Sequence, residues 1–232
     1  MKYMGGKSGL AKDLAKVIEG GSKLWEPFCG GGAMTVVLAP QFETVEASDA
    51  HEDLILMWQA LCKGWEPPNN VTEDEYRALR MAEPSALRGF VGFACSWGGK
   101  WFGGYARGSQ TSGAARNYAD ESSRSLLRDV EKAGNVNFSC KSYTDIKPGP
   151  GDVVYADPPY AGTTKYSRIF DSDQFWAVAE SWASSGALVF VSEYVAPSGW
   201  PCVWEKTYTR NMKADAKTAV KVTDKLFFKG PW

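Results

Sequence analysis

The spacing of hydrophobic and polar residues divides the first part of the chain into alternating helices and strands. Apolar residues recur every three or four positions behind Ser8, a suitable N-cap, as far as Ile18, and again from His51 to Cys62, which predicts two helices. Residues 23–28 and 43–48 have the composition of short strands, and a glycine turn that opens another helix follows the first of them. This alternation is typical of the start of a doubly wound, mostly parallel α/β sheet.

The middle of the chain breaks this rhythm and the second half resumes it. Thr72–Met81 and Ser85–Cys95 have helical spacing, but residues 96–119 combine glycine, aromatic and basic residues without an acid. Such a segment has too much glycine for a core element and too many aromatic rings for a flexible linker, so we expect a surface hairpin or loop that contacts a partner. The elements predicted after it are a helix at 122–133, strands at 136–140 and 153–156, a helix at 173–182, and strands at 187–192, 202–209 and 225–229.

The composition is that of a globular protein outside the membrane. The 232 residues are 44% hydrophobic, no apolar run is long enough to span a bilayer, and the first ten residues lack a signal-peptide core. We therefore expect a cytoplasmic protein without a membrane partner. The five cysteines form no CxxC pair and His51 is the only histidine, so we expect neither a metal site nor histidine-based nucleophilic catalysis.

The net charge of −1 hides two basic stretches. Pro84–Ala119 holds four basic residues and no acid, and Lys206–Trp232 holds seven basic residues and two acids. Local positive charge on a nearly neutral protein suits a polyanionic partner, although a run of charge is also what an ordinary solvated surface carries.

The sequence EPFCGGGAM, residues 26–34, places three glycines between a predicted strand and a predicted helix. Glycine lets the backbone adopt positive φ values and lets a ligand approach it closely. A dinucleotide fold would need glycine where Thr35 stands, and a Walker A loop would need the GK[ST] ending that is missing here. S-adenosylmethionine fits better, because Asp49 ends the next strand and its carboxylate can accept both ribose hydroxyls. A simple tight turn is the alternative interpretation.

The sequence VVYADPPY, residues 153–160, places an acid at the end of an apolar strand. Ligands of open α/β sheets lie beyond the carboxyl ends of such strands. Asp157 could accept one N–H of an exocyclic amine during methyl transfer, the rigid carbonyl of Pro158 could accept the other, and Tyr160 could stack on a flipped-out base. The alternative is that the two prolines only end the strand and that Asp157 is a surface turn residue.

Five motifs occur in an order that resembles a known enzyme family. They are KYMGGK, EPFCGGG, ASDAHEDL, YTDI and ADPPY, and the resemblance covers essentially the whole chain. The chain resembles the Dam-like DNA adenine-N6 methyltransferases, especially their compact phage-type members. The resemblance implies a Rossmann-like methyltransferase fold, with a mostly parallel seven-stranded sheet and one antiparallel strand near its edge. It also implies a catalytic domain at 1–64 and 134–232 and a small helical or hairpin target-recognition insert at 65–133.

The resemblance further implies the reaction and its components. The enzyme would transfer a methyl group from S-adenosylmethionine to a flipped-out adenine of double-stranded DNA and release S-adenosylhomocysteine, without a metal, as a monomer or weak dimer. Such enzymes serve in restriction-modification or in phage. GATC is the commonest target of relatives, but this insert is shorter than usual, so relaxed specificity stays open.

The family motifs assign site residues to three groups. Asp157, Pro158 and Tyr160 would hold the target base, with Tyr166 closing over it. The residues implied for S-adenosylmethionine are Tyr3, Lys7, Glu26, Pro27, Phe28, Gly30, Gly31, Gly32, Asp49, Asp145, Ile146 and Asp157. The residues expected to contact DNA are Lys100, Trp101, Tyr105, Arg107, Arg116, Asn117 and Arg124, which combine cations, aromatic rings and polar groups in the insert.

Several alternatives remain at this point. Trp97, Trp101 and Phe102 could be core residues of the insert instead of DNA contacts. Other amino methyltransferases act on cytosine N4, RNA adenine or protein glutamine, but cytosine enzymes more often carry Ser and glutamine enzymes Asn where Asp157 stands. A catalytically inactive nucleic-acid-binding relative is the third class, and it predicts erosion at Asp49, Asp157 or Tyr160, none of which is eroded.

Overall fold

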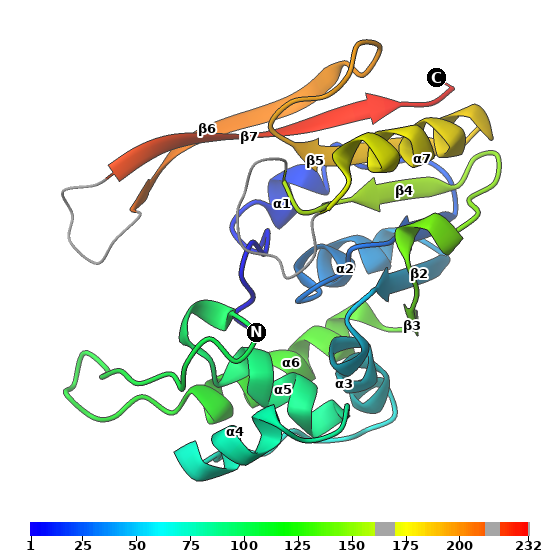
Figure 1. Ribbon diagram of the computed structural model, residues 1–232. Helices are drawn as coiled ribbons and strands as arrows, with labels where there is room; N and C mark the ends of the chain where they lie inside the picture. The colour runs from blue at the N-terminus through cyan, green and yellow to red at the C-terminus, as the bar shows by residue number, and fades with distance from the viewer. Residues whose placement is uncertain (161–169, 212–218, 232) are drawn as a thin grey trace.

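Seven strands form a single sheet in the computed structural model, which describes residues 1–160, 170–211 and 219–231 (Figure 1). The strands lie in the order β3-β2-β1-β4-β5-β7-β6. Their bounds are β1 Lys23–Glu26, β2 Thr44–Asp49, β3 Val136–Cys140, β4 Val153–Ala156, β5 Leu188–Glu193, β6 Cys202–Asn211 and β7 Ala219–Lys229.

Strand β7 is antiparallel to the other six strands: it pairs antiparallel with both β5 and β6, while the other pairs are parallel. The predicted sheet, mostly parallel with one antiparallel strand near its edge, is therefore confirmed. The chain builds outward from β1 through β2 to β3 on one side and from β4 to β5 on the other. The boundary between β1 and β4 is thus the topological switch point, where ligands of such sheets bind.

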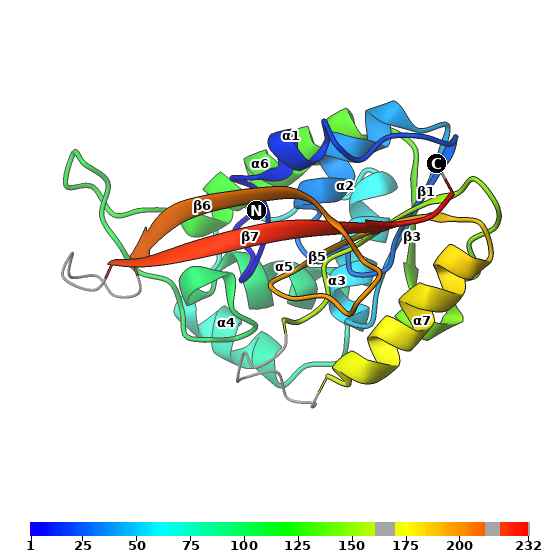
Figure 2. The ribbon, with the colours of Figure 1, turned by 90° about the horizontal axis from the view of Figure 1, so that it is seen from above.

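Helices cover both faces of the sheet. Helices α1 (Ala11–Leu14) and α2 (Ala33–Leu38) lie on one side and α7 (Ser172–Ser184) on the other, as Figure 2 shows from above. Alternate residues of β4 divide between two hydrophobic clusters: Val153 and Tyr155 belong to the first, and Val154 and Ala156 pack towards α7. A strand buried on both faces reads as a continuous apolar run, which is why β4 is recognisable in the sequence.

The helix predicted behind Ser8 is shorter than expected. Helix α1 begins only at Ala11, and no side chain caps it; the amides of Leu10 and Ala11 donate instead to the backbone carbonyl of Lys7, at 2.7 and 2.8 Å. The Ser8 cap was a wrong prediction, because a backbone turn satisfies the amides that the serine would have bound.

The insert between β2 and β3 is helical and packs closely on α3 (Glu52–Cys62). It contains α4 (Glu73–Arg80), α5 (Ala86–Ala94) and α6 (Tyr118–Ala133), which form the lower part of the molecule in Figure 1. A Cβ on Gly89 of α5 would lie 2.1 Å from the carbonyl oxygen of Asp53, so only glycine permits this approach. One hydrophobic cluster includes residues of the insert and of the sheet. The division at residues 65 and 133 stays a prediction.

Two elements extend from the same side of the molecule. Strands β6 and β7 form a long hairpin that reaches past the rest of the sheet, and the loop between α5 and α6 projects in the same direction in Figures 1 and 2. Antiparallel bridges join Ser96 to Tyr105 and Ser109 to Ala115 in this loop. The predicted surface hairpin or loop is therefore present.

No helix in the described part of the chain has the length and apolar character needed to cross a bilayer.

Candidate active site

The switch point brings three acidic residues from three strands to one edge of the sheet. Glu26 is the last residue of β1 and pairs in register with Ala47 of β2, two positions before Asp49. Trp25 pairs with Val154 of β4, three positions before Asp157. Because the three strands are parallel, their carboxyl ends meet, and the glycine turn lies between them.

The glycine turn has a strict steric requirement of its own. Gly30 and Gly32 have φ values of +48° and +71°, and a Cβ on Gly32 would lie 2.5 Å from the ring of Trp58. The Trp58 indole nitrogen donates to the carbonyl of Gly30 at 3.1 Å. A Cβ on Gly31 would meet the side chain of Tyr3 at 2.5 Å. The structure thus brings Tyr3 onto the turn, and packing alone already requires these glycines.

Asp49 holds the turn in place. Its two carboxylate oxygens accept the backbone amides of Gly30, at 3.0 Å, and of His51, at 2.9 Å. Burial raises the pKa of this carboxyl, and the two amides oppose that shift by stabilising the charged form. Each carboxylate oxygen can accept more than one hydrogen bond, so Asp49 keeps capacity for a further donor.

Glu26 is the most strongly perturbed carboxyl at this edge. Its side chain is buried and accepts the hydroxyl of Thr35 at 2.6 Å. Burial raises its pKa to about 8, and the charges of Asp157 and Asp49 push it in the same direction. Glu26 is therefore largely protonated at neutral pH in the protein alone.

Asp157 follows β4 and forms an ion pair with Lys7. The ammonium of Lys7 lies 2.9 Å from Oδ1 of Asp157, and both side chains are mostly buried. Burial raises the pKa of Asp157, while Lys7 lowers it. Pro158 is buried directly beside it. The structure thus brings Lys7, expected at the cofactor, to the DPPY motif, and a contact with the cofactor stays a prediction.

Tyr160 joins the same network through its hydroxyl. Lys7 donates to that hydroxyl at 2.5 Å and also lies 4.5 Å from the centre of the ring. The hydroxyl donates in turn to Oδ1 of Asp224 at 3.4 Å. Burial and nearby negative charges raise the pKa of Tyr160, so it stays a neutral hydroxyl.

Asp224 was missed in the sequence analysis. It is buried on β7, it accepts the hydroxyl of Tyr208 at 2.5 Å, and its Oδ1 lies 4.0 Å from the ammonium of Lys7. One signal in the sequence could have found it: Asp224 alternates with the apolar residues Val222 and Leu226, so it is an acid on the apolar face of a strand.

An aromatic cluster lines the other side of the switch point. Phe28 stacks on Tyr143 with ring centres 5.3 Å apart, and the rings of Phe170 and Phe175 complete the cluster. Ile146, expected at the cofactor, is buried among the residues around Phe175. Pro27 is also buried, and Asp145 is exposed. Tyr166, expected to close over the base, lies outside the described residues.

The donor set fits S-adenosylmethionine. Glu26, Asp49 and Asp157 are three carboxyl groups whose pKa burial raises. If all three ionised, they would carry three negative charges against the one positive charge of Lys7. A cofactor with a cationic sulfonium and an ammonium group would relieve that imbalance. Asp49 can receive hydroxyl donors, and Phe28 offers an aromatic wall. Among the described residues, no group of three or more His, Cys, Asp or Glu side chains is arranged to hold a metal ion.

The residues expected to contact DNA fall into two groups. In the first, Trp97 is 65% exposed and Lys100 is exposed, whereas Phe102 is buried, so the core interpretation holds for Phe102 and fails for Trp97. Trp101 is half-buried, with its ring centre 4.3 Å from that of His51. Tyr105 is half-buried as well and donates its hydroxyl to the carbonyl of Val71 at 2.6 Å.

The second group already has partners within the protein. Three arginines each pair with an acid on a helix of the insert, and Asn117 caps α6 by accepting the amide of Asp120 at 3.0 Å. The pairs are Arg107 with Glu73, Arg116 with Glu121 and Arg124 with Asp120. Contact of these residues with DNA stays a prediction, and each arginine would exchange or share an ion pair to make it.

Known DNA adenine methylases are similar to the chain in sequence. The DNA adenine methylase of Vibrio cholerae serotype O1 is 27% identical over 184 residues, which cover 69% of this chain and 64% of that protein. The retron Ec67 DNA adenine methylase of Escherichia coli is 26% identical over 218 residues, covering 83% and 75%. The DNA adenine methylase of Escherichia coli K12 is 29% identical over 182 residues, covering 69% and 64%. The chain thus matches less than two thirds of the length of the Vibrio and K12 relatives.

One family profile matches most of the chain. The profile of the D12 class N6 adenine-specific DNA methyltransferases matches residues 3–86 and 102–198, which include the glycine turn, Asp49 and the DPPY motif. With this match, the seven-stranded sheet is the Rossmann-like methyltransferase fold that the sequence predicts. The chain belongs to the D12 class of N6 adenine-specific DNA methyltransferases.

Proposed function

We propose that this protein transfers a methyl group from S-adenosylmethionine to the N6 amino group of adenine in double-stranded DNA. The observation that carries the proposal is the position of Asp157 in a D12-class chain: it stands at the switch point, beside the glycine turn and mostly buried against Lys7. The cofactor would supply an activated methyl group on a positively charged sulfur. The protein's own residues would supply alignment and electrostatic stabilisation.

Asp157 would act on the amine. The lone pair of an adenine amino group is delocalised into the ring, so the nitrogen is a poor nucleophile until it becomes pyramidal. A carboxylate that accepts one N–H favours that geometry and stabilises the positive charge that develops on nitrogen. Asp157 must be ionised to do this, and Lys7, 2.9 Å away, stabilises the ionised form against the effect of burial.

Pro158 and Tyr160 would hold the base. Pro158 is buried and its ring fixes the backbone, so its carbonyl is a rigid acceptor for the second N–H. Tyr160 is held by Lys7 and Asp224 through its hydroxyl, and its ring would stack on a base that has left the duplex. This arrangement supports base flipping because an amine inside a base pair could not reach Asp157.

Cofactor binding would use the remaining predicted residues. Asp49 would accept the ribose hydroxyls, and the acidic edge formed with Glu26 would receive the cationic part of the cofactor. Phe28 directly precedes the glycine turn, and Tyr3 packs onto the turn from the N-terminal segment. Both rings would provide aromatic surface to the cofactor. Asp145 is exposed and near Tyr143, where it could meet the cofactor's adenine.

DNA would bind along the side from which the α5–α6 loop projects. Lys100 and Trp97 are exposed on this loop, and Arg107 lies on it in an exposed ion pair that a phosphate could replace. A role in restriction-modification or in phage, and a monomer or weak dimer as the working state, belong to the same proposal.

A direct assay tests the proposal. Purified protein is incubated with methyl-labelled S-adenosylmethionine and unmethylated double-stranded DNA, and the nucleosides are separated by mass spectrometry. We expect label in N6-methyladenine, and sequencing of modified bases in DNA from expressing cells would give the recognised sequence. Label only in N4-methylcytosine, label only with RNA as the substrate, or cofactor binding without transfer to any nucleic acid would each overturn it.

A further inference from the structure

Asp224 has no role in the chemistry described so far, although it is one of the most buried acids in the described chain. It is 6% exposed and lies on β7, in the part of the hairpin nearest the switch point. A carboxylate at such a position is costly unless charged or polar groups compensate it. The partners of Asp224 therefore indicate why it is there.

The hairpin itself does not neutralise Asp224. Its cross-strand neighbour is Lys206, but the ammonium of Lys206 lies 2.8 Å from Asp13 instead. The cation near Asp224 is Lys7, 4.0 Å from Oδ1. Lys7 therefore stands between two carboxylates, because its distance to Asp157 is 2.9 Å.

The hydroxyl of Tyr160 is also shared. It accepts from Lys7 and donates to Asp224 at 3.4 Å, and its hydrogen bonding also lowers the pKa of Asp157. A hydroxyl has one proton, so it can donate fully to only one of the two carboxylates. When the Tyr160 hydroxyl donates its hydrogen bond to Asp224, Asp157 keeps its capacity to accept the N–H of a substrate amine.

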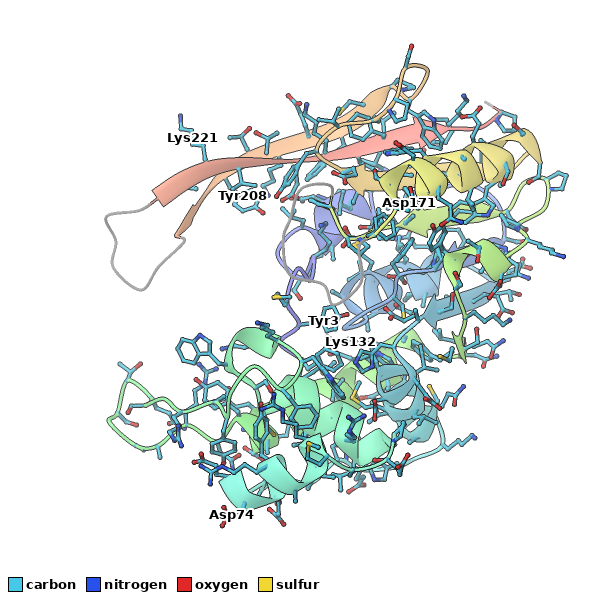
Figure 3. The ribbon with its side chains drawn as sticks, in the orientation of Figure 1. Tyr3, Asp74, Lys132, Asp171, Tyr208 and Lys221 are labelled. Carbon is cyan, nitrogen blue, oxygen red and sulfur yellow. The ribbon has the colours of Figure 1, made fainter. Side chains whose placement is uncertain are left out.

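Tyr208 fixes Asp224 from the hairpin. Its hydroxyl donates to Oδ2 of Asp224 at 2.5 Å, which leaves Oδ1 directed to Lys7 and Tyr160. In Figure 3, Tyr208 lies on the side of the hairpin that faces the rest of the molecule, and Lys221 lies on the opposite side. The hairpin thereby fixes one carboxylate oxygen of Asp224 and leaves the other to Lys7 and Tyr160.

We propose that Asp224 is a positioning residue for methyl transfer: fixed by Tyr208, Asp224 accepts the hydrogen bond of the Tyr160 hydroxyl and shares Lys7 with Asp157, so that Asp157 stays available to the substrate amine. This inference rests on the proposed function. It assigns a role to strand β7, which lies outside the segments matched by the family profile.

The test compares three variants in the full-length protein. Asp224→Asn removes the charge without changing the shape, Tyr208→Phe removes the fixing hydroxyl, and Thr223→Val is the matched control. Thr223 neighbours Asp224 and makes a hydroxyl contact of 2.8 Å with Thr207 across the hairpin, so its replacement perturbs the same strand pair. Single-turnover methyl transfer, the KM for DNA, S-adenosylmethionine affinity and thermal unfolding are measured for each.

We expect the turnover rate of Asp224→Asn to fall roughly 10- to 100-fold, the range for loss of a hydrogen-bonded charged group. The KM for DNA and the affinity for S-adenosylmethionine should stay within about twofold, because neither ligand is bound through Asp224. Tyr208→Phe should lose less, and the double variant should be no slower than Asp224→Asn, since Tyr208 acts through Asp224. Rates equal to those of Thr223→Val, or cofactor affinity falling in step with rate, would overturn the inference.

A second measurement does not depend on methyl transfer. Acylation of Lys7 by an amine-reactive ester is followed by mass spectrometry, and we expect it to be several-fold faster in Asp224→Asn because one of the two carboxylates that hold the ammonium is gone. Acylation at the rate of the Thr223→Val control would contradict the inference. An inactive wild-type protein would overturn the proposed function, while this measurement still decides the contact.

Discussion

The switch point and the insert hold their charges in opposite ways. At the switch point, Lys7 serves Asp157, Tyr160 and Asp224 at once, and all of these groups are buried or nearly so. In the insert, Arg107 pairs with Glu73 of α4 and Arg124 pairs with Asp120 one turn away in α6, and both arginines are exposed. Exposed pairs contribute about 0–1 kcal/mol, whereas loss of one member of a buried pair costs about 3–5 kcal/mol. One region is therefore fixed in advance, and the other can exchange its partners for phosphates.

The largest expected effect comes from Asp157. Replacing it with Ala should reduce methyl transfer by about 100- to 1000-fold, because the N–H acceptor that stabilises developing charge is lost. Binding of S-adenosylmethionine should persist, which calorimetry with the purified variant would show. A matched replacement, Asp152→Ala, removes a carboxylate whose partner is the Trp25 indole, at 2.8 Å and at the other end of β4. Unchanged turnover in Asp157→Ala would contradict the role assigned here.

The next effect concerns Glu26 and the pH dependence of stability. The folded protein keeps the proton on Glu26 up to about pH 8, whereas the unfolded chain releases it near 4.5. Between these values the unfolded state binds fewer protons, so the contribution of Glu26 to the free energy of unfolding falls as pH rises, by about 1.4 kcal/mol per pH unit.

Glu26→Gln should remove that dependence. Urea unfolding without cofactor, from pH 4 to 9, should show the variant gaining stability relative to the wild type as pH rises from about 4.5 to about 8. The control is Glu46→Gln on the neighbouring strand, where the carboxylate accepts an exposed hydrogen bond from Asn137. A stability difference between Glu26→Gln and wild type that does not vary with pH would show that Glu26 is ionised in the fold.

The smallest effect belongs to the insert. Replacing both Lys100 and Arg107 with Ala should weaken DNA binding and make the slope of log affinity against log salt less negative by about 1.8, if each contacts one phosphate. Stability should change by less than about 0.5 kcal/mol, since both side chains are exposed. The double variant Lys16→Ala and Lys63→Ala makes the same change of charge at exposed positions elsewhere. Equal salt slopes for the two variants would move the DNA-binding face away from this loop.

The sequence predicts most of the fold because its strands carry local signals. Strand β3 has the predicted bounds, and β4 is apolar on both faces. The helix predicted from Ser122 begins earlier, at Tyr118, because Asn117 caps it and the glycine-rich segment ends there. Helix α1 is shorter than predicted because the carbonyl of Lys7 replaces the expected cap.

The site is predictable where a motif ends a strand and not where partners come from elsewhere. Asp49 and Asp157 follow strands, so topology alone brings them to one edge. Lys7 and Asp224 meet there only through tertiary contacts, and no local pattern relates them. The absence of acids in 84–119 suggests free cations, but Glu73 before that stretch and Glu121 after it pair with its arginines.

The position of Asp224 late in the chain also bears on how the active protein is made. Lys7 is synthesised long before β7, yet Lys7 and Asp224 of β7 meet in one network. Contacts between distant parts of a chain form slowly because a large loop must close first. A nascent chain that stops before β7 would possess Asp157 and Lys7 without Asp224. The full set of contacts around Asp157 should therefore form only after β7 has left the ribosome.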